Sequence, residues 1–460
     1  MGDLSDTICA LSTPPGRSGI AVVRMSGPES AALAGRIFVP QKPCESSASR
    51  HALLGRIIDP HNGSEIDEGI LISYRAPHSY TGEDMAEFSL HGSPVLAAAL
   101  LESLCNLGAR LAEPGEFTMR AFLHGRIDLS QAEAVRDIIE STTLYQAQVA
   151  ARQRSGSLAS RLGPLRKSLI DIIAQLESAV EFAEEDLPVA SRDTLSDRLE
   201  EARAELKRMI DSFHRGRIVR NGFSMAVVGR PNAGKSSLFN ALLAQERSIV
   251  TDVPGTTRDL VSEFTSIGGI PVRIADTAGI REPHDAIERL GIDRSRQAIA
   301  DADLVLLVAD TSRPLSEEDL VLKEQLVGIL CVAALNKRDL PSCWSALEKK
   351  EFAGFNPAVE VSAKTMDGVG ELRDVILERL LGPAASSQEG ILVTNLRHCR
   401  NLEEAELALT DSITALYSGL SEEFALADLH RSLRHLGAIT GETGVEDILD
   451  EIFSQFCVGK

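Results

Sequence analysis

The 460-residue sequence is poor in basic residues and aromatic residues, and each shortage argues against a class of protein. It has 47 Lys and Arg residues against 67 Asp and Glu residues, which gives a net charge of −20. A broadly basic nucleic-acid surface is therefore absent, and any tRNA contact needs a local patch or a second protein. Aromatic residues make up only 4%, so the sequence gives no sign of a stacking platform for single-stranded bases.

Paired cysteines and long apolar runs are also missing. The seven cysteines are scattered without a CxxC pair or metal-ligand spacing, which is typical of a reduced intracellular protein. No apolar run reaches about 18 residues, and the N-terminus has no basic segment followed by an apolar one. We therefore expect a cytoplasmic protein without a membrane segment, long enough for two or three domains.

Residues 229–236 read Gly-Arg-Pro-Asn-Ala-Gly-Lys-Ser and match the phosphate-binding pattern G-x-x-x-x-G-K-[ST]. The apolar run 225–228 predicts the strand before this loop, and residues 237–243 predict the helix after it. Backbone N–H groups at the glycines would face the β-phosphate, while Lys235 would reach the β- and γ-phosphates and Ser236 would bind Mg²⁺. The nucleotide-binding residues expected here are Asn232, Ala233, Gly234, Lys235, Ser236 and Ser237. A glycine-rich turn that matches by chance is the alternative, and the later motifs argue against it.

The base is read by a second motif. A predicted strand over 329–335 ends in Asn336-Lys337-Arg338-Asp339, the N-K-x-D pattern of GTPases. The Asp339 carboxylate can accept hydrogen bonds from N1–H and the 2-amino group of guanine, and adenine offers neither donor, so the pocket favours GTP over ATP. After a further predicted strand, Ser362, Ala363 and Lys364 resemble the loop whose backbone contacts the guanine oxygen.

The metal-binding and switch segments lie between these motifs. Asp276, Thr277, Ala278 and Gly279 follow a predicted strand, where the aspartate would hold Mg²⁺ through water and the Gly279 N–H would sense the γ-phosphate. Thr257, in the predicted first switch 252–259, would add a second hydroxyl to Mg²⁺. Ile280 stands where many small GTPases carry the glutamine that orients the attacking water, so another group must do this. The acceptors nearby are Glu282, Asp285 and Glu288.

The composition along the chain predicts an α/β GTPase inserted into a helical domain. Strands and helices alternate between about 222 and 382, as in a doubly wound parallel sheet. Apolar residues recur every three or four positions on both sides of this segment, over 169–180, 195–213, 402–416 and 426–436. We infer one discontinuous helical domain, with two separate helical arms as the alternative. The first 118 residues, with strands predicted at 8–11, 19–24, 69–74 and 85–90 and a helix over 94–107, predict an α+β module.

The whole chain resembles the MnmE (TrmE) family of tRNA-modification GTPases. The matching stretches begin at Ala10, Ser79, Pro114, Asp128, Gly229 and Gly255, and the last is the ending Phe456-Cys-Val-Gly-Lys460. The resemblance implies a folate-binding and dimerisation domain over 1–118, a helical domain over 119–221 and 383–460, and a GTPase domain over 222–382. We expect Cys457 to be a buried small apolar residue rather than a nucleophile, because no His partner is near it in sequence.

This resemblance also implies partners and cofactors. It implies a cytoplasmic homodimer that joins an FAD-dependent protein of the MnmG (GidA) family in a heterotetramer and adds a carboxymethylaminomethyl or aminomethyl group to C5 of the wobble uridine of certain tRNAs. A one-carbon tetrahydrofolate, 5-formyl- or methylene-tetrahydrofolate, would bind the N-terminal domain. The residues at the family's folate-binding positions are Arg24, Glu87, Arg126 and Lys460; some members have Lys in place of Arg126.

The family further implies hydrolysis that depends on K⁺. The ion would be held by Asn232 and by oxygens of Thr251, Val253 and Thr256, and Thr251, Thr256 and Thr257 would also border the nucleotide. Glu288 stands at the position of the glutamate that orients water. Arg258 and Arg281 are alternative finger-like groups. Two other functions stay open at this point: a GTP-dependent switch that acts on the ribosome or another partner without folate, and, less well supported because of Asp339, an ATP-dependent kinase.

Overall fold

The computed structural model describes residues 5–42, 49–181, 192–244, 262–276, 299–354, 356–382, 392–418, 421–442, 449 and 452–460. The chain forms two compact units. The first contains the residues up to 136 together with 153–160 and those from 434 onward, and the second contains residues 137–152 and 161–433. Each unit is described by itself.

The first unit is built on a seven-stranded sheet with the strand order β3-β4-β5-β6-β2-β1-β7. All neighbouring strands are antiparallel except β1 and β7. The strands are β1 (Ile8–Leu11), β2 (Ile20–Ser26), β3 (Phe38–Pro40), β4 (Ala52–Ile58), β5 (Glu65–Tyr74), β6 (Met85–His91) and β7 (Arg110–Leu111). The four strands predicted from the sequence correspond to β1, β2, β5 and β6.

One face of this sheet is covered by α1 (Ser30–Ile37) and α2 (Pro94–Asn106). Strand residues that point to this face, among them Val23, Leu71 and Phe88, join buried residues of both helices in one core. Alternate residues therefore point to the opposite face, which no helix of that core covers. Two further helices follow, α3 (Glu116–Leu123) and α4 (Leu129–Glu140).

The GTPase part of the second unit has a six-stranded sheet with the order β13-β12-β11-β8-β10-β9. Its strands are β8 (Phe223–Val228), β9 (Ser262–Ile267), β10 (Ile270–Asp276), β11 (Leu304–Asp310), β12 (Cys331–Asn336) and β13 (Ala358–Glu360), and only the β9–β10 pair is antiparallel. Met225 and Val227 point to a core with α9 (Lys235–Ala244) and α13 (Val369–Leu381). Ala226 and Val228 point to the other core, with α11 (Glu317–Gln325) and α12 (Ala346–Ala353). The sheet is therefore covered by helices on both faces.

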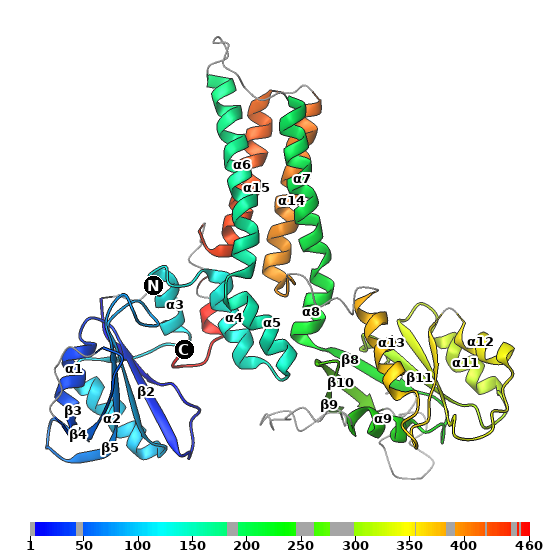
Figure 1. Ribbon diagram of the computed structural model, residues 1–460, viewed down its shortest axis with the longest axis horizontal. Helices are drawn as coiled ribbons and strands as arrows, with labels where there is room; N and C mark the ends of the chain where they lie inside the picture. The colour runs from blue at the N-terminus through cyan, green and yellow to red at the C-terminus, as the bar shows by residue number, and fades with distance from the viewer. Residues whose placement is uncertain are drawn as a thin grey trace. The chain divides into compact units, whose positions relative to one another are not determined.

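The helices on either side of the GTPase part pack together. They are α5 (Leu144–Arg154), α6 (Ser157–Glu181), α7 (Arg192–Asp211), α8 (Phe213–Asn221), α14 (Leu396–Tyr417) and α15 (Glu422–Thr440). Figure 1 shows the long helices α6, α7, α14 and α15 side by side. Contacts join helices from the two sides: Arg192 of α7 pairs with Glu422 of α15 at 2.8 Å, and His430 of α15 lies 3.3 Å from Glu177 of α6. The predicted fold class is confirmed, and the two-arm alternative is wrong.

One predicted helix is interrupted. The apolar repeat predicted a single helix through Phe213, but α7 ends at Asp211 and Phe213 begins α8. Ser212 lies at the break, where its Oγ donates to the Met209 carbonyl at 2.6 Å and accepts from Val393 N at 3.1 Å. This side chain therefore competes with helix continuation and ties the break to the segment before α14. The predicted domain boundaries at 118, 221 and 382 stay a prediction.

Candidate functional site

The phosphate-binding loop lies between β8 and α9, where only glycine fits at two positions. Gly229 has φ +153°, and a Cβ there would lie 2.1 Å from the Val308 carbonyl oxygen. Gly234 has φ +90°, and its Cβ would lie 2.3 Å from Asn336 Nδ2. The loop therefore packs its backbone directly against β11 and the end of β12.

The groups that would meet a phosphate gather at the start of α9. Lys235 is the first residue of this helix, and its Nζ donates to the carbonyls of Gly229 at 2.7 Å and Arg230 at 2.9 Å. The next two residues, Ser236 and Ser237, are exposed. A helix start with free N–H groups, a positive dipole end and a lysine suits a polyphosphate. Asn232 is exposed at the top of the loop, with φ +65°.

Asn336 joins the base-reading segments to this loop. Its side chain is buried, donates from Nδ2 to the Ala233 carbonyl at 2.9 Å and accepts from Ala363 N at 3.2 Å. Ser362 Oγ donates to Asp339 Oδ1 at 2.7 Å, which orients a carboxylate that otherwise faces solvent. Three segments that are distant in sequence thus meet here, and Lys364 is exposed beside them.

Asp310 is a site residue that the motif analysis missed. It ends β11, and its Oδ2 accepts from Lys337 Nζ at 2.6 Å. Burial opposes its ionisation, but the hydrogen bonds from Lys337 and Ser312 prevail and lower the pKa of Asp310. An aspartate at the carboxyl end of a buried parallel strand was the available signal. The ion pair fixes Lys337, which has φ +69°.

The Mg²⁺ and K⁺ residues are only partly described. The backbone of Asp276 ends β10, which runs parallel to β8, with Asp276 opposite Val227. This register places the aspartate backbone beside the strand that enters the phosphate-binding loop. The other predicted residues lie outside the described residues: Thr251, Val253, Thr256, Thr257, Thr277, Ala278, Gly279 and Glu288. Among the described residues, no group of three or more His, Cys, Asp or Glu could hold a metal ion.

The predicted folate residues Arg24 and Glu87 lie opposite each other on β2 and β6. The Arg24 Nε and an Nη donate to Glu87 Oε1 at 2.9 Å and 2.8 Å. Tyr74 OH donates to the other carboxylate oxygen of Glu87 at 3.1 Å. The Arg24 guanidinium also lies 5.4 Å from the ring centre of Tyr80 and 5.7 Å from that of Phe117. The guanidinium is thus in contact with two aromatic rings, a feature the motifs did not reveal.

The C-terminal tail brings Lys460 to this pair. Val458 forms a β-bridge with Pro114, and Ser12 Oγ donates to the Gly459 carbonyl at 3.1 Å. Gly459 has φ +94°, and a Cβ there would lie 2.4 Å from the Leu11 carbonyl oxygen, so glycine is required. Burial and the neighbouring Arg24 lower the pKa of Lys460, while Glu87 opposes that shift.

Two predictions for this region fare differently. Arg126 is exposed, and within the described part of the chain its side chain forms no ion pair. Its side chain passes close to Gly82: a Cβ added at Gly82 would lie 3.3 Å from Arg126 Cγ. The prediction that Cys457 is buried is wrong, because the thiol is exposed. The extended tail buries Phe456 and Gly459 instead, and Cys457 contributes its carbonyl to Gly115 N at 3.4 Å.

None of the described helices combines the length and the apolar character needed to cross a membrane.

Comparison with known proteins covers the whole chain. Residues 7–126 match the model of the GTP-binding protein TrmE N-terminus, and residues 129–457 match the MnmE helical domain. The tRNA modification GTPase MnmE of Koribacter versatilis is 45% identical over 100% of both chains. The proteins of that name from Alkaliphilus oremlandii and Clostridioides difficile are 40% identical over 99% of this chain and 100% of their own. Among solved structures, the G domain of the T. maritima FeoB iron transporter is 29% identical, with a TM-score of 0.27, over 34% of this chain and 98% of its own.

These matches confirm the resemblance inferred from the motifs, and the chain belongs to the MnmE family of tRNA modification GTPases.

Proposed function

We propose that this GTPase hydrolyses GTP in a K⁺-dependent reaction that drives modification of C5 of the wobble uridine of certain tRNAs. As a family member it is a GTP hydrolase of tRNA modification, with GTP and GDP as nucleotides and Mg²⁺ as the general metal. The single observation that carries the proposal is the meeting of the phosphate-binding loop with Asn336, Asp339 and Ser362, because this geometry suits a guanine nucleotide. The modification would add a carboxymethylaminomethyl or aminomethyl group together with an FAD-dependent MnmG-type partner, in the cytoplasm.

The K⁺ part of the proposal involves Asn232. This exposed residue stands at the top of the phosphate-binding loop, where its side-chain oxygen could reach an ion beside the phosphates. A monovalent cation there would neutralise charge that develops on the phosphates. The remaining oxygens would come from Thr251, Val253 and Thr256, and Glu288 would orient the attacking water.

Enzyme kinetics test this part. Glu288→Ala should retain GTP binding and lose fast hydrolysis, and Asn232→Ala should lose the stimulation by K⁺ over Na⁺. Equal phosphate release in K⁺ and Na⁺ by the unaltered protein would exclude the K⁺ site. Near-normal turnover of Glu288→Ala would exclude the assigned water-orienting residue.

The N-terminal unit supports the proposed folate site and homodimer. Arg24 and Glu87 lie on the sheet face that the core helices leave uncovered, and so does the cross-strand pair Leu54 and Ile70. These two apolar side chains are 46% and 39% exposed, which suits a surface covered by a second copy. A folate would supply a one-carbon unit, while Arg24, Glu87 and Lys460 would bind and orient it.

Isothermal titration of the full-length protein with 5-formyl-tetrahydrofolate separates this function from a nucleotide switch without folate. Binding that is lost in Glu87→Ala supports the proposed site. Absence of binding to the unaltered protein would favour the switch. Sedimentation of Leu54→Asp should show a shift from dimer to monomer, and an unchanged dimer would exclude this face.

A further inference from the structure

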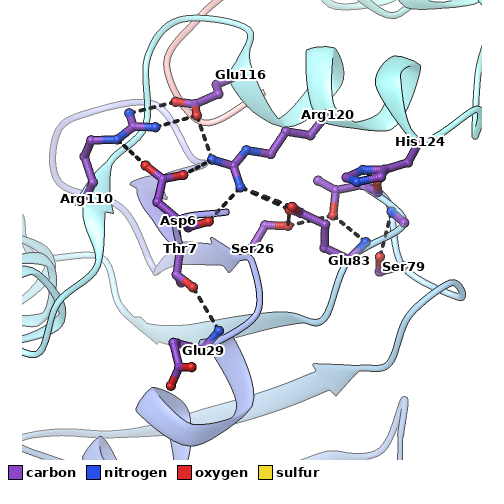
Figure 2. Close-up of polar contacts among 12 residues, drawn as sticks. Asp6, Thr7, Ser26, Glu29, Ser79, Glu83, Arg110, Glu116, Arg120 and His124 are labelled. Carbon is purple, nitrogen blue, oxygen red and sulfur yellow. Dashed lines mark hydrogen bonds and ion pairs between the residues drawn. The ribbon is translucent and has the colours of Figure 1, made fainter. Parts of the chain in front are cut away.

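A buried arginine, Arg120, connects three segments of the N-terminal unit (Figure 2). It lies in α3 and is 0% exposed. Its guanidinium donates to Asp6 Oδ1 at 2.5 Å, to the Asp6 carbonyl at 2.9 Å, to Glu83 Oε1 at 3.2 Å and to Glu116 Oε1 at 2.9 Å. Both terminal nitrogens of the guanidinium thus have carboxylate partners, and because a buried charge must be paired, the network fixes the positions of its members.

Through Glu83, the network holds the loop formed by residues 79–83, which we call the Tyr80 loop. Ser26 Oγ lies 2.7 Å from Glu83 Oε2 and 2.6 Å from Thr81 Oγ1. The ring of His124 donates from Nδ1 to the Thr81 carbonyl at 2.9 Å. Ser26 at the end of β2, together with Arg120 in α3 and His124 at the C-terminal end of that helix, therefore restrains this loop.

The same arginine is part of α3, the helix that carries one of the two rings beside Arg24. Phe117 and Thr118 stand on this helix, and Phe117 is 0% exposed. Thr118 Oγ1 lies 2.9 Å from Tyr80 OH, so a hydrogen bond joins the helix to the Tyr80 loop. Tyr80 and Phe117 are the two rings beside the Arg24 guanidinium. The spacing of the two rings thus depends on how α3 and the Tyr80 loop are held together.

The tail that carries Lys460 depends on the same network. Glu116 accepts from Glu113 N at 2.8 Å and so restrains the turn that contains Pro114. Pro114 forms the bridge to Val458. One carboxylate partner of Arg120 thereby sets the place where the tail is bound.

We propose that Arg120 is a positioning residue of the proposed folate site: it holds α3 and the Tyr80 loop at the spacing that places the rings of Tyr80 and Phe117 beside the Arg24 guanidinium. The identity of the ligand rests on the proposed folate site, whereas the arrangement of the two rings beside Arg24 rests on the geometry alone. Arg120 touches no ligand in this account and acts through Tyr80, Thr118 and Glu116.

The test compares Arg120→Lys with Arg110→Lys in the full-length protein. A lysine keeps the charge but cannot reach three acceptors at once in the same plane. Arg110 binds Asp6 and Glu116, two of the same carboxylates, but not Glu83, so it is a matched control. We expect Arg120→Lys to weaken 5-formyl-tetrahydrofolate binding about tenfold, which corresponds to about 1.4 kcal/mol, and Arg110→Lys to stay close to the unaltered protein.

A readout without folate follows the pocket itself. Nitration of Tyr80 by tetranitromethane, measured by mass spectrometry against the 65% exposed Tyr417, should become several-fold faster in Arg120→Lys and stay slow in Arg110→Lys. Unchanged GTP hydrolysis would show that each variant is folded in its second unit, and amide hydrogen exchange of α2 would show it for the first. If Arg120→Lys does not fold, Glu83→Gln releases only the Tyr80 loop and should give the same two changes more weakly.

The outcomes separate the possible roles. A double variant with Tyr80→Leu should lose clearly less folate affinity than the sum of the two single losses, because both changes disturb the same ring. A folded Arg120→Lys protein with slow Tyr80 nitration would overturn the proposal, and so would equal losses in Arg110→Lys. If the unaltered protein binds no folate, the proposed ligand is wrong, and the nitration rates still decide the role of Arg120.

Discussion

Asn336 Nδ2 donates to the carbonyl oxygen of Ala233, 103 residues earlier in the chain, at 2.9 Å. Base-reading and phosphate-binding segments are therefore joined by one buried amide, which also accepts from Ala363 N. The pocket is held by this amide before any nucleotide contacts it.

Replacing this amide should weaken binding of both nucleotides. Asn336→Ala leaves the Ala233 carbonyl and the Ala363 N–H without their partner, a loss of about 1–3 kcal/mol for a buried group. We expect GDP and GTP affinities to fall by about one to two powers of ten, measured with fluorescent guanine nucleotides. An affinity loss for GTP alone would contradict the role of Asn336 as a joint between loops.

Asp339 should determine the choice of base. The carboxylate of Asp339 accepts from N1–H and the 2-amino group of guanine, while xanthine presents a carbonyl oxygen in place of that amino group. Asp339→Asn should therefore lose roughly 100-fold or more in GTP affinity and gain affinity for XTP, because the amide can donate to this oxygen. Competition between the two nucleotides measures the change. Retained preference for GTP would show that another group reads the base.

The turn between β9 and β10 should couple the GTPase part to α5. Gly269 has φ +78°, and a Cβ there would lie 2.8 Å from Tyr145 Cβ. Its carbonyl also accepts from Thr143 Oγ1 at 2.5 Å. Gly269→Ala should destabilise the second unit by about 1–3 kcal/mol through overpacking against Tyr145, in addition to the cost of the backbone strain.

Gly328→Ala is the matched control for this prediction. Gly328 has a similar φ, +85°, but a Cβ there meets nothing within 4 Å. The backbone cost is thus shared by both variants, and thermal unfolding should show the larger loss for Gly269→Ala. Equal losses would mean that the contact with Tyr145 contributes nothing.

The Arg120 network should make the N-terminal unit sensitive to acid. Burial opposes ionisation of Asp6 and Glu116, but hydrogen bonds from Arg110 and Arg120 prevail and lower the pKa of both carboxyls. A carboxyl with a lowered pKa in the folded state stabilises the fold above its ordinary pKa of about 4, and this stabilisation is lost as the pH falls through the lowered value. Hydrogen exchange of α3 between pH 7 and pH 3 should therefore accelerate below about pH 4 beyond the intrinsic rate.

Arg110→Gln checks the cause of this acid sensitivity. Removing the arginine takes away the main hydrogen bond that lowers both pKa values, so the acid-induced change in α3 should become smaller. An unchanged pH profile would show that other groups govern it.

The sequence predicted those features that depend on neighbouring residues. The phosphate-binding loop and the base-reading loops were found because each motif is defined by neighbouring residues in a fixed order. The loops then meet in space because they follow parallel strands, whose carboxyl ends lie at the same edge of the sheet. The helical domain was predicted from its apolar repeats, although the break at Ser212 was not, because Ser212 bonds to Val393, 181 residues later.

Contacts between distant segments were beyond such reasoning. Arg120 is bound by Asp6, 114 residues earlier, and no pattern in the sequence pairs them. The same holds for Tyr80 and Phe117 beside Arg24, and for Asp310 as partner of Lys337. Cys457 was expected to be buried because it is a small apolar residue without a His partner near it in sequence, but the backbone pairing of the tail decides which side chains face outward.

Mass spectrometry of wobble-uridine nucleosides tests the central claim most directly. The tRNA would come from a strain that lacks this protein and carries either the unaltered chain or Lys235→Ala, which removes the phosphate-binding ammonium group. We predict that the C5 modification is absent in the deletion strain, returns with the unaltered chain and stays absent with Lys235→Ala. Unchanged modification in the deletion strain, or full recovery with Lys235→Ala, would contradict the account.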